Sequence, residues 1–171
     1  FCRTLLGVDE PRVGLLSVGS EEGKGNRQVR EAYALLAASG LNFVGNVEGH
    51  DLSLGKINVV VCDGFVGNVL MKFAEGLGRT LSEHLQTELK GKLKDSERAT
   101  LTRGIYDILN QPELLGGGPL YGINGLAIVG HGGARAPAVA KAIHLVREAK
   151  ERNLIANIQE ELSRLQERVK I

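Results

Sequence analysis

Three glycine-rich loops hold the side chains that are best suited to chemistry. The loops cover residues 19–26, 63–68 and 130–133. Glycine allows a ligand to approach the backbone closely, and exposed N–H groups of such loops can hold an anion. The loops carry a lysine cation, an aspartate carboxylate, asparagine amides and a histidine imidazole. This combination suits the binding of an anion and the transfer of a proton.

Lys24 is the candidate cation of the first loop. It stands between Gly23 and Gly25, where a lysine that serves only stability would gain little. A lysine in such a place is typical of a point charge that binds phosphate. The segment lacks the GxxxxGK[ST] pattern and is therefore not a Walker A loop. The alternative is an exposed loop lysine without a ligand.

The second loop follows an apolar run at residues 59–62 that predicts a buried strand. Asp63 ends this run, and open parallel sheets bind their ligands just beyond such strand ends. We expect a helix to open near Gly67, so that its free N–H groups hold an anion. The alternative is a tight turn in which Asp63 caps the helix. In the third loop, His131 is either a ligand or a histidine bonded to the backbone.

The elements that must position these loops alternate between strands and helices. Apolar runs predict strands at residues 12–18, 41–47, 57–62 and 126–129. Helical spacing predicts helices at residues 27–39, 68–90, 96–109 and 134–149, and a last apolar stripe from Leu154 to Val169. This order predicts parallel βαβ units in a layered α/β fold of one domain. Parallel strands would bring all three loops to one edge of the sheet.

The composition excludes several classes of protein. Of the 171 residues, 43% are hydrophobic and 24% are charged, as in ordinary globular proteins. A net charge of +1 gives no argument for a nucleic-acid partner, so none is expected. The apolar runs are too short to span a bilayer, and no Cys and His cluster has the spacing of a metal site. Cys62 lies in an apolar run and is expected to be a buried hydrophobe in a reducing compartment.

The chain contains four distinctive blocks of sequence, namely RVGLLSVGSEEGKGN, SGLNFVGNVEGHD, VVVCDGFVGNVLMK and GGGPLYGINGLAIVGHG. These blocks resemble the C-terminal half of the PlsX phosphate acyltransferase family and occur in the order found in that family. The glycine-rich N-terminal half with its DAMGGD-like motif is absent. Residues 1–171 are therefore expected to form the C-terminal part of a phosphate acyltransferase domain. The chain departs from the GGAPLLG-like loop of the family at Gly118 and Tyr121.

The resemblance implies the transfer of a fatty acyl group from acyl carrier protein to inorganic phosphate, for phospholipid synthesis. It implies a cytoplasmic homodimer that needs no cofactor or metal. It also implies a layered α/β/α sandwich with a mainly parallel sheet, as in phosphotransacetylases and isocitrate dehydrogenase, and a projecting helical hairpin. The hairpin helices, over residues 68–112, are expected to form a core or dimer face, with contact to a membrane surface or a partner protein as the second interpretation.

Roles for individual residues follow from the chemistry of this reaction. The block at Asp63 is similar to the D-x-x-x-G-N element of phosphotransacetylases, in which the aspartate is the proposed acid–base residue. We expect Lys24 to bind phosphate, Asn68 to stabilise the oxyanion and Asp63 to handle the proton. Further substrate-binding residues are expected at Gly23, Gly25, Asn26, Gly64, Gly67, Gly117, Gly118, His131 and Gly132.

Two other functions compete with this interpretation. A phosphate acetyl- or butyryltransferase would use coenzyme A in place of a carrier protein. A non-catalytic segment would only dimerise or dock on a membrane. A dehydrogenase of the isocitrate type shares the architecture, but the sequence has neither its carboxylate cluster for a divalent metal nor a cofactor motif.

Overall fold

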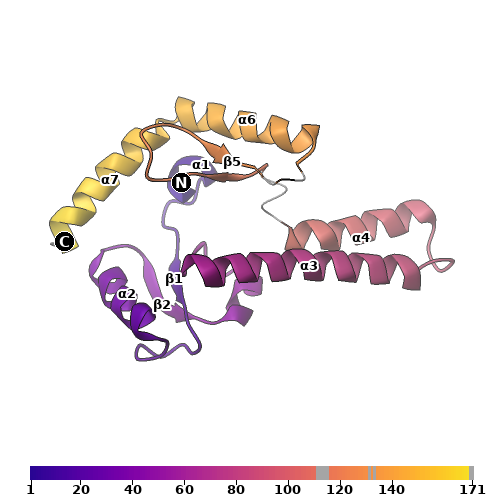
Figure 1. Ribbon diagram of the computed structural model, residues 1–171, viewed down its shortest axis with the longest axis horizontal. Coiled ribbons are helices and arrows are strands. Elements are labelled where there is room, and N and C mark those ends of the chain that lie inside the picture. The colour runs from indigo at the N-terminus through magenta and orange to yellow at the C-terminus, as the bar shows by residue number, and fades with distance from the viewer. Residues whose placement is uncertain (111–115, 131, 133, 170–171) are drawn as a thin grey trace. The chain divides into compact units, whose positions relative to one another are not determined.

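A computed structural model describes residues 1–110, 116–130, 132 and 134–169 (Figure 1). The chain divides into two compact units. Unit 1 consists of Phe1–Asp63 and Glu148–Ile171, and unit 2 consists of Gly64–Arg147. Strands and helices both occur, and the mixed α/β class expected from the sequence is confirmed. The expectation of a single domain stays a prediction.

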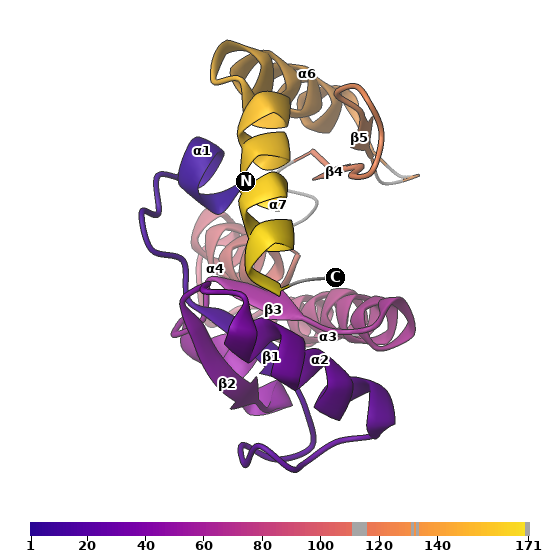
Figure 2. The ribbon, with the colours of Figure 1, turned by 90° about the vertical axis from the view of Figure 1, so that its left-hand side faces the viewer.

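Unit 1 is built on a parallel sheet of three strands (Figure 2). The strands are β1 (Val13–Leu16), β2 (Phe43–Val47) and β3 (Val59–Val61), in the order β2-β1-β3. The three expected strands are confirmed, and each is shorter than its apolar run. Leu15 of β1 pairs with Asn46 on one side and with Val61 on the other, so the three strands end at nearly the same level. The carboxyl ends of all three therefore share one edge of the sheet.

Helix α2 (Arg27–Ala38) connects β1 to β2 and packs on the sheet. Its bounds agree with the expected helix at residues 27–39. The ring of Tyr33 meets that of Phe43 edge-on, with centroids 5.1 Å apart. Gly14 of β1 has no room for a side chain, because a Cβ there would lie 2.6 Å from Cγ1 of Val47. This close approach keeps the two strands and their apolar side chains tightly packed.

The remaining elements of unit 1 are α1 (Cys2–Leu6), the 3-10 helix η1 (Gly49–Leu54) and α7 (Leu154–Val169). The expected helix at residues 154–169 is confirmed. Polar contacts join the two ends of the chain: Arg152 donates to the carbonyl of Thr4 at 3.0 Å, and Arg3 pairs with Glu161 at 3.5 Å. These contacts join α7 and the turn before it to α1, the first helix of the same unit.

Unit 2 begins with a pair of helices, α3 (Gly64–Glu88) and α4 (Asp95–Leu109). Thr102 is 1% exposed and joins them, because its hydroxyl accepts from the Gln86 amide at 2.5 Å and its carbonyl accepts from the Ser82 hydroxyl. The predicted helical pair is confirmed. The expected start of α3 is wrong, because the helix begins at Gly64 rather than near Gly67. Asp63 is a residue type that favours the position before a helix, so no separate loop is needed after β3.

The second part of unit 2 holds β4 (Gly118–Pro119), β5 (Ile128–Val129) and α6 (Ala136–Glu151). Strand β5 pairs antiparallel with β4 in a sheet of two strands, so the expectation that it joins the parallel sheet is wrong. The connection between β4 and β5 is short, and a short connection suits antiparallel pairing of two successive strands with each other.

Candidate functional site

The candidate site lies at the carboxyl edge of the parallel sheet in unit 1. The loop that follows β1 starts at Ser17, whose N–H donates to the carbonyl of Val47 at 2.9 Å. Asp63 comes two residues after the end of β3. The first predicted loop and Asp63 therefore share one edge of the sheet, where parallel sheets bind ligands. We use the name sheet-edge site for Ser17, Lys24, Asn46 and Asp63.

The loop that carries Lys24 is held from strand β2. The carbonyl of Glu21 accepts two hydrogen bonds, one from Nδ2 of Asn46 at 2.7 Å and one from the N–H of Lys24 at 3.0 Å. Asn46 is only 6% exposed, so this tether is protected from water. A buried hydrogen bond of this kind fixes the loop because breaking it would leave polar groups unsatisfied.

The same loop is also held on its other side, by helix α2. Gly25 has φ +98°, a conformation that favours glycine, and its carbonyl accepts from the Arg30 guanidinium at 2.5 Å. Asn26 caps the helix by accepting from the N–H of Val29 at 2.9 Å. Lys24 is exposed between these fixed points, and within the described part of the chain it has no ion pair. A rigid loop thus presents a free ammonium group, as an anion site requires.

Gly19 provides the space for the stem of Lys24. It is buried, and a Cβ at this position would lie 2.9 Å from Cγ of Lys24 and 3.2 Å from Cδ. Gly19→Ala must therefore displace the Lys24 side chain while the tethers of the loop persist. We expect this variant to raise the KM for inorganic phosphate about fivefold, the effect of a weakened charge-assisted hydrogen bond. Steady-state kinetics would measure it, with Gly104→Ala in unit 2 as control, because Gly104 is exposed and a Cβ there meets no atom within 4 Å. Equal KM values for both variants would contradict the expectation.

Sequence reasoning missed two residues of the sheet-edge site. Oγ of Ser17 and Oδ1 of Asn46 are buried and have no hydrogen-bond partner among the described residues. Buried polar atoms are normally paired, so an unpaired one calls for an explanation such as a ligand. The signal in the sequence was an asparagine inside the apolar strand FVGNV, close to its carboxyl end.

Asp63 and its neighbours lie where strand β3 passes into helix α3. Asp63 is half-buried at the end of unit 1, and Gly64 is the first residue of α3 in unit 2. Gly67 lies in the first turns of this helix, and Asn68 is exposed one residue later. Cys62 is exposed, so the expectation that it is buried is wrong. The physical reason is that β3 ends at Val61, which leaves Cys62 beyond the last strand pairing.

Gly117 has a clear structural role in unit 2, and Gly118, Gly132 and His131 follow it along the chain. Gly117 has φ +145°, and a Cβ there would lie 2.9 Å from Cγ2 of Ile128, so the close approach of β4 and β5 depends on glycine. Gly118 pairs with Val129 in the same small sheet. Gly132 is exposed, and His131 lies outside the described residues. The substrate-binding roles expected for these residues stay predictions.

Within the part of the chain that the structure describes, no helix is both long and apolar enough to cross a membrane. No group of three or more His, Cys, Asp and Glu side chains there is arranged to hold a metal ion.

Comparison with known proteins gives one consistent family. Residues 1–157 match the family described as fatty acid synthesis protein. A phosphate acyltransferase of Heliobacterium modesticaldum is 42% identical over 170 residues, which are 95% of this chain and 49% of that protein. One from Nitratidesulfovibrio vulgaris is 47% identical over 150 residues, 85% of this chain and 43% of that protein. One from Salinibacter ruber is 42% identical over 164 residues, 94% of this chain and 48% of that protein.

The chain thus spans about half the length of the curated relatives that it matches. The matched region includes every residue of the sheet-edge site and the whole of unit 2. The resemblance noted in the sequence is therefore confirmed, and the chain belongs to the fatty acid synthesis protein family of PlsX-type phosphate acyltransferases.

Proposed function

We propose that the protein transfers a fatty acyl group from acyl carrier protein to inorganic phosphate, and that the acyl phosphate formed serves phospholipid synthesis. The observation that carries this proposal is the tethered loop that presents Lys24 at the carboxyl edge of a parallel sheet. The names of the relatives support the class of reaction. Because the chain spans about half of each relative, the activity of the whole protein is part of the proposal.

The proposed reaction is a displacement at a thioester. An oxygen of hydrogen phosphate attacks the carbonyl carbon, a C–O bond forms, and the C–S bond breaks as the carrier thiolate leaves. The proton of hydrogen phosphate ends on the thiol sulfur. Phosphate is already an anionic nucleophile, so it needs positioning and charge neutralisation more than deprotonation. The ammonium group of Lys24 supplies both.

The other residues divide the remaining tasks. Asn68 donates to the oxyanion of the tetrahedral intermediate. Asp63 carries the proton between phosphate and thiol, and in the reverse direction it deprotonates the thiol. The Ser17 hydroxyl is placed to donate to the bound phosphate, since it is buried and unpaired at the same edge. Asn46 acts as a positioning residue through its hydrogen bond to the Lys24 loop.

The test measures acyl phosphate and free thiol together. We expect the purified protein to consume acyl carrier protein thioester only when phosphate is present, with one thiol released for each acyl phosphate trapped by hydroxylamine. Acyl-coenzyme A is the matched alternative donor. Faster phosphate-dependent consumption of acyl-coenzyme A would favour the phosphotransacetylase alternative. Absence of both products with either donor would favour a non-catalytic segment.

Assembly and location belong to the same proposal. Helix α3 leaves large apolar side chains exposed, among them Phe65 at 77% and Phe73 at 66%. Exposed apolar surface of this kind marks sites of interaction with protein or lipid. This surface supports a homodimer, with peripheral membrane contact through the α3 and α4 helices as its second use. The cytoplasmic location in the proposal rests on the family resemblance alone.

A further inference from the structure

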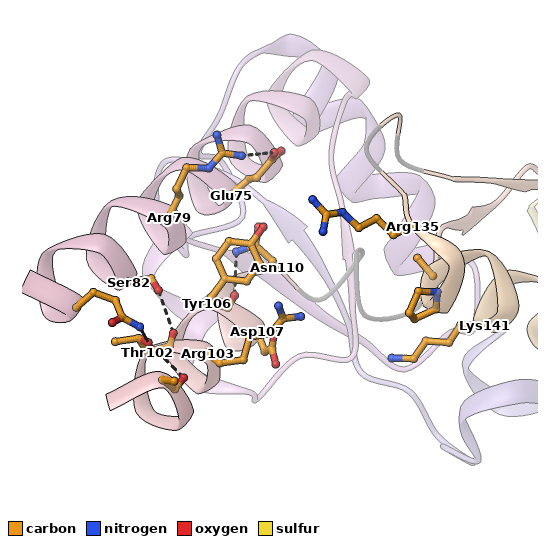
Figure 3. A pocket seen from close by; sticks show the side chains of 14 residues that line it. Glu75, Arg79, Ser82, Thr102, Arg103, Tyr106, Asp107, Asn110, Arg135 and Lys141 are labelled. Atoms are coloured by element: carbon orange, nitrogen blue, oxygen red, sulfur yellow. Dashed lines mark hydrogen bonds and ion pairs between the residues drawn. The ribbon is translucent and has the colours of Figure 1, made fainter. Parts of the chain in front are cut away.

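Unit 2 contains a cleft that none of the roles above uses. It has a volume of about 760 Å³ and lies between the α3–α4 pair and the first turns of α6 (Figure 3). Clefts of this size hold small organic ligands. Its cations are Arg79, Arg103, Arg135 and Lys141, and we call it the basic cleft. The carboxylates that line it are Glu75 and Asp107.

The cations of the basic cleft are only partly neutralised. Arg103 pairs with Asp107 at 2.8 Å, and Arg79 lies 3.8 Å from Glu75. Arg135 and Lys141 are exposed, and neither has an ion pair with any residue that the structure describes. The cations therefore exceed the carboxylates, and the excess charge belongs to the two residues contributed by the α6 side.

The geometry of the cleft favours an anion that carries an organic part. Arg135 directly precedes α6, and its carbonyl accepts from the N–H groups of Ala138 and Val139, so the positive end of the helix lies at the cleft. On the opposite wall the guanidinium of Arg103 lies over the ring of Tyr106, with its Cζ 5.6 Å from the ring centroid. The buried amide of Asn110 also lines the cleft. Aromatic and amide groups beside free cations suit a phosphate ester better than a lipid chain or a bare phosphate ion.

We propose that the basic cleft binds the phosphate ester of the pantetheine arm of the acyl donor, with Arg135 and Lys141 as the direct contacts. That the ligand is the acyl donor rests on the proposed function. The same ester chemistry occurs in the arm of a carrier protein and in coenzyme A. The phosphate ester and the thioester are at opposite ends of the arm. The cleft would therefore contribute to binding of the donor rather than to the chemical step.

The test measures binding by titration calorimetry without turnover. The probes are holo acyl carrier protein, apo carrier protein without the arm, coenzyme A and inorganic phosphate. Arg135→Ala and Lys141→Ala are each expected to weaken binding of the arm-bearing probe about tenfold, the effect of losing one charge-assisted hydrogen bond. Lys150→Ala is the matched control, because Lys150 is exposed on the same helix and does not line the cleft.

The outcomes distinguish a carrier protein from coenzyme A as the source of the ester, and they show whether the proposal stands. Weaker binding of holo carrier with unchanged apo carrier supports the arm of a carrier protein, and weaker binding of coenzyme A alone supports the free coenzyme. Equal weakening of apo and holo carrier would overturn the proposal, since the cleft would then contact the carrier surface. Unchanged binding of all probes, or no binding to the unmodified protein, would also overturn it. Lys24→Ala should leave the affinities for the carrier and coenzyme probes unchanged and should weaken binding of inorganic phosphate alone, so a failure of the proposed reaction is recognised separately.

Discussion

Lys24→Ala is expected to lower kcat/KM for inorganic phosphate about 100-fold or more, because a preorganised charge facing the reacting anion contributes strongly to catalysis. The loop that carries Lys24 is tethered by Asn46 on one side and by Arg30 on the other. The substitution should therefore remove the ammonium group and leave the loop in place. Steady-state kinetics with varied phosphate would measure the loss, and the KM for the acyl donor should change little.

Two further variants test whether the loss is specific to the charge of Lys24. Lys56→Ala removes an exposed lysine of unit 1 that precedes β3, at the amino rather than the carboxyl edge of the sheet. Its kinetics should match those of the unmodified protein. Lys24→Arg keeps the charge and should recover part of the activity, although its planar donor group differs in shape. Normal phosphate kinetics in Lys24→Ala would remove the role proposed for this residue.

Asp63→Asn is expected to lower kcat about 100-fold in both directions of the reaction, the usual effect of losing a general acid–base group. The choice of asparagine separates catalysis from folding. Asparagine caps helices as well as aspartate does, so a residue that only starts α3 would tolerate the change. Rates of acyl phosphate formation and of its reversal, together with thermal unfolding, would decide between the two roles.

The control for this variant is Asp9→Asn, which removes an exposed carboxylate of unit 1 on the amino side of β1. Its rates should not change. An unchanged rate in Asp63→Asn, with an unchanged melting temperature, would leave Asp63 as a helix cap and would move proton transfer to another group or to water.

Lys24 and Asp63 of the sheet-edge site were accessible from the sequence because their signals are local, whereas Ser17 and Asn46 were missed. A glycine on each side of Lys24 marks a loop, and the apolar run before Asp63 marks the strand that ends there. Family resemblance then linked these loops to one reaction. The support of the loop was not accessible, because Asn46 reaches the Glu21 carbonyl across 25 positions of sequence. The sequence around one side chain in a strand does not indicate which distant carbonyl group that side chain will bind.

By itself, the sequence determined the order of β1, α2, β2, β3 and α7 in unit 1, the bounds of α2, the pair α3 and α4, and the family. These follow from apolar periodicity, capping residues and motifs, which act over one or two turns of chain. Only the tertiary structure decided that β5 pairs with β4, that α3 starts directly after Asp63, and that four cations line one cleft in unit 2. The cleft depends on contacts between segments distant in sequence, whose free energy no local pattern encodes. The partner of β5 and the first residue of α3 depend on the neighbours that the folded chain supplies, which apolar periodicity does not specify.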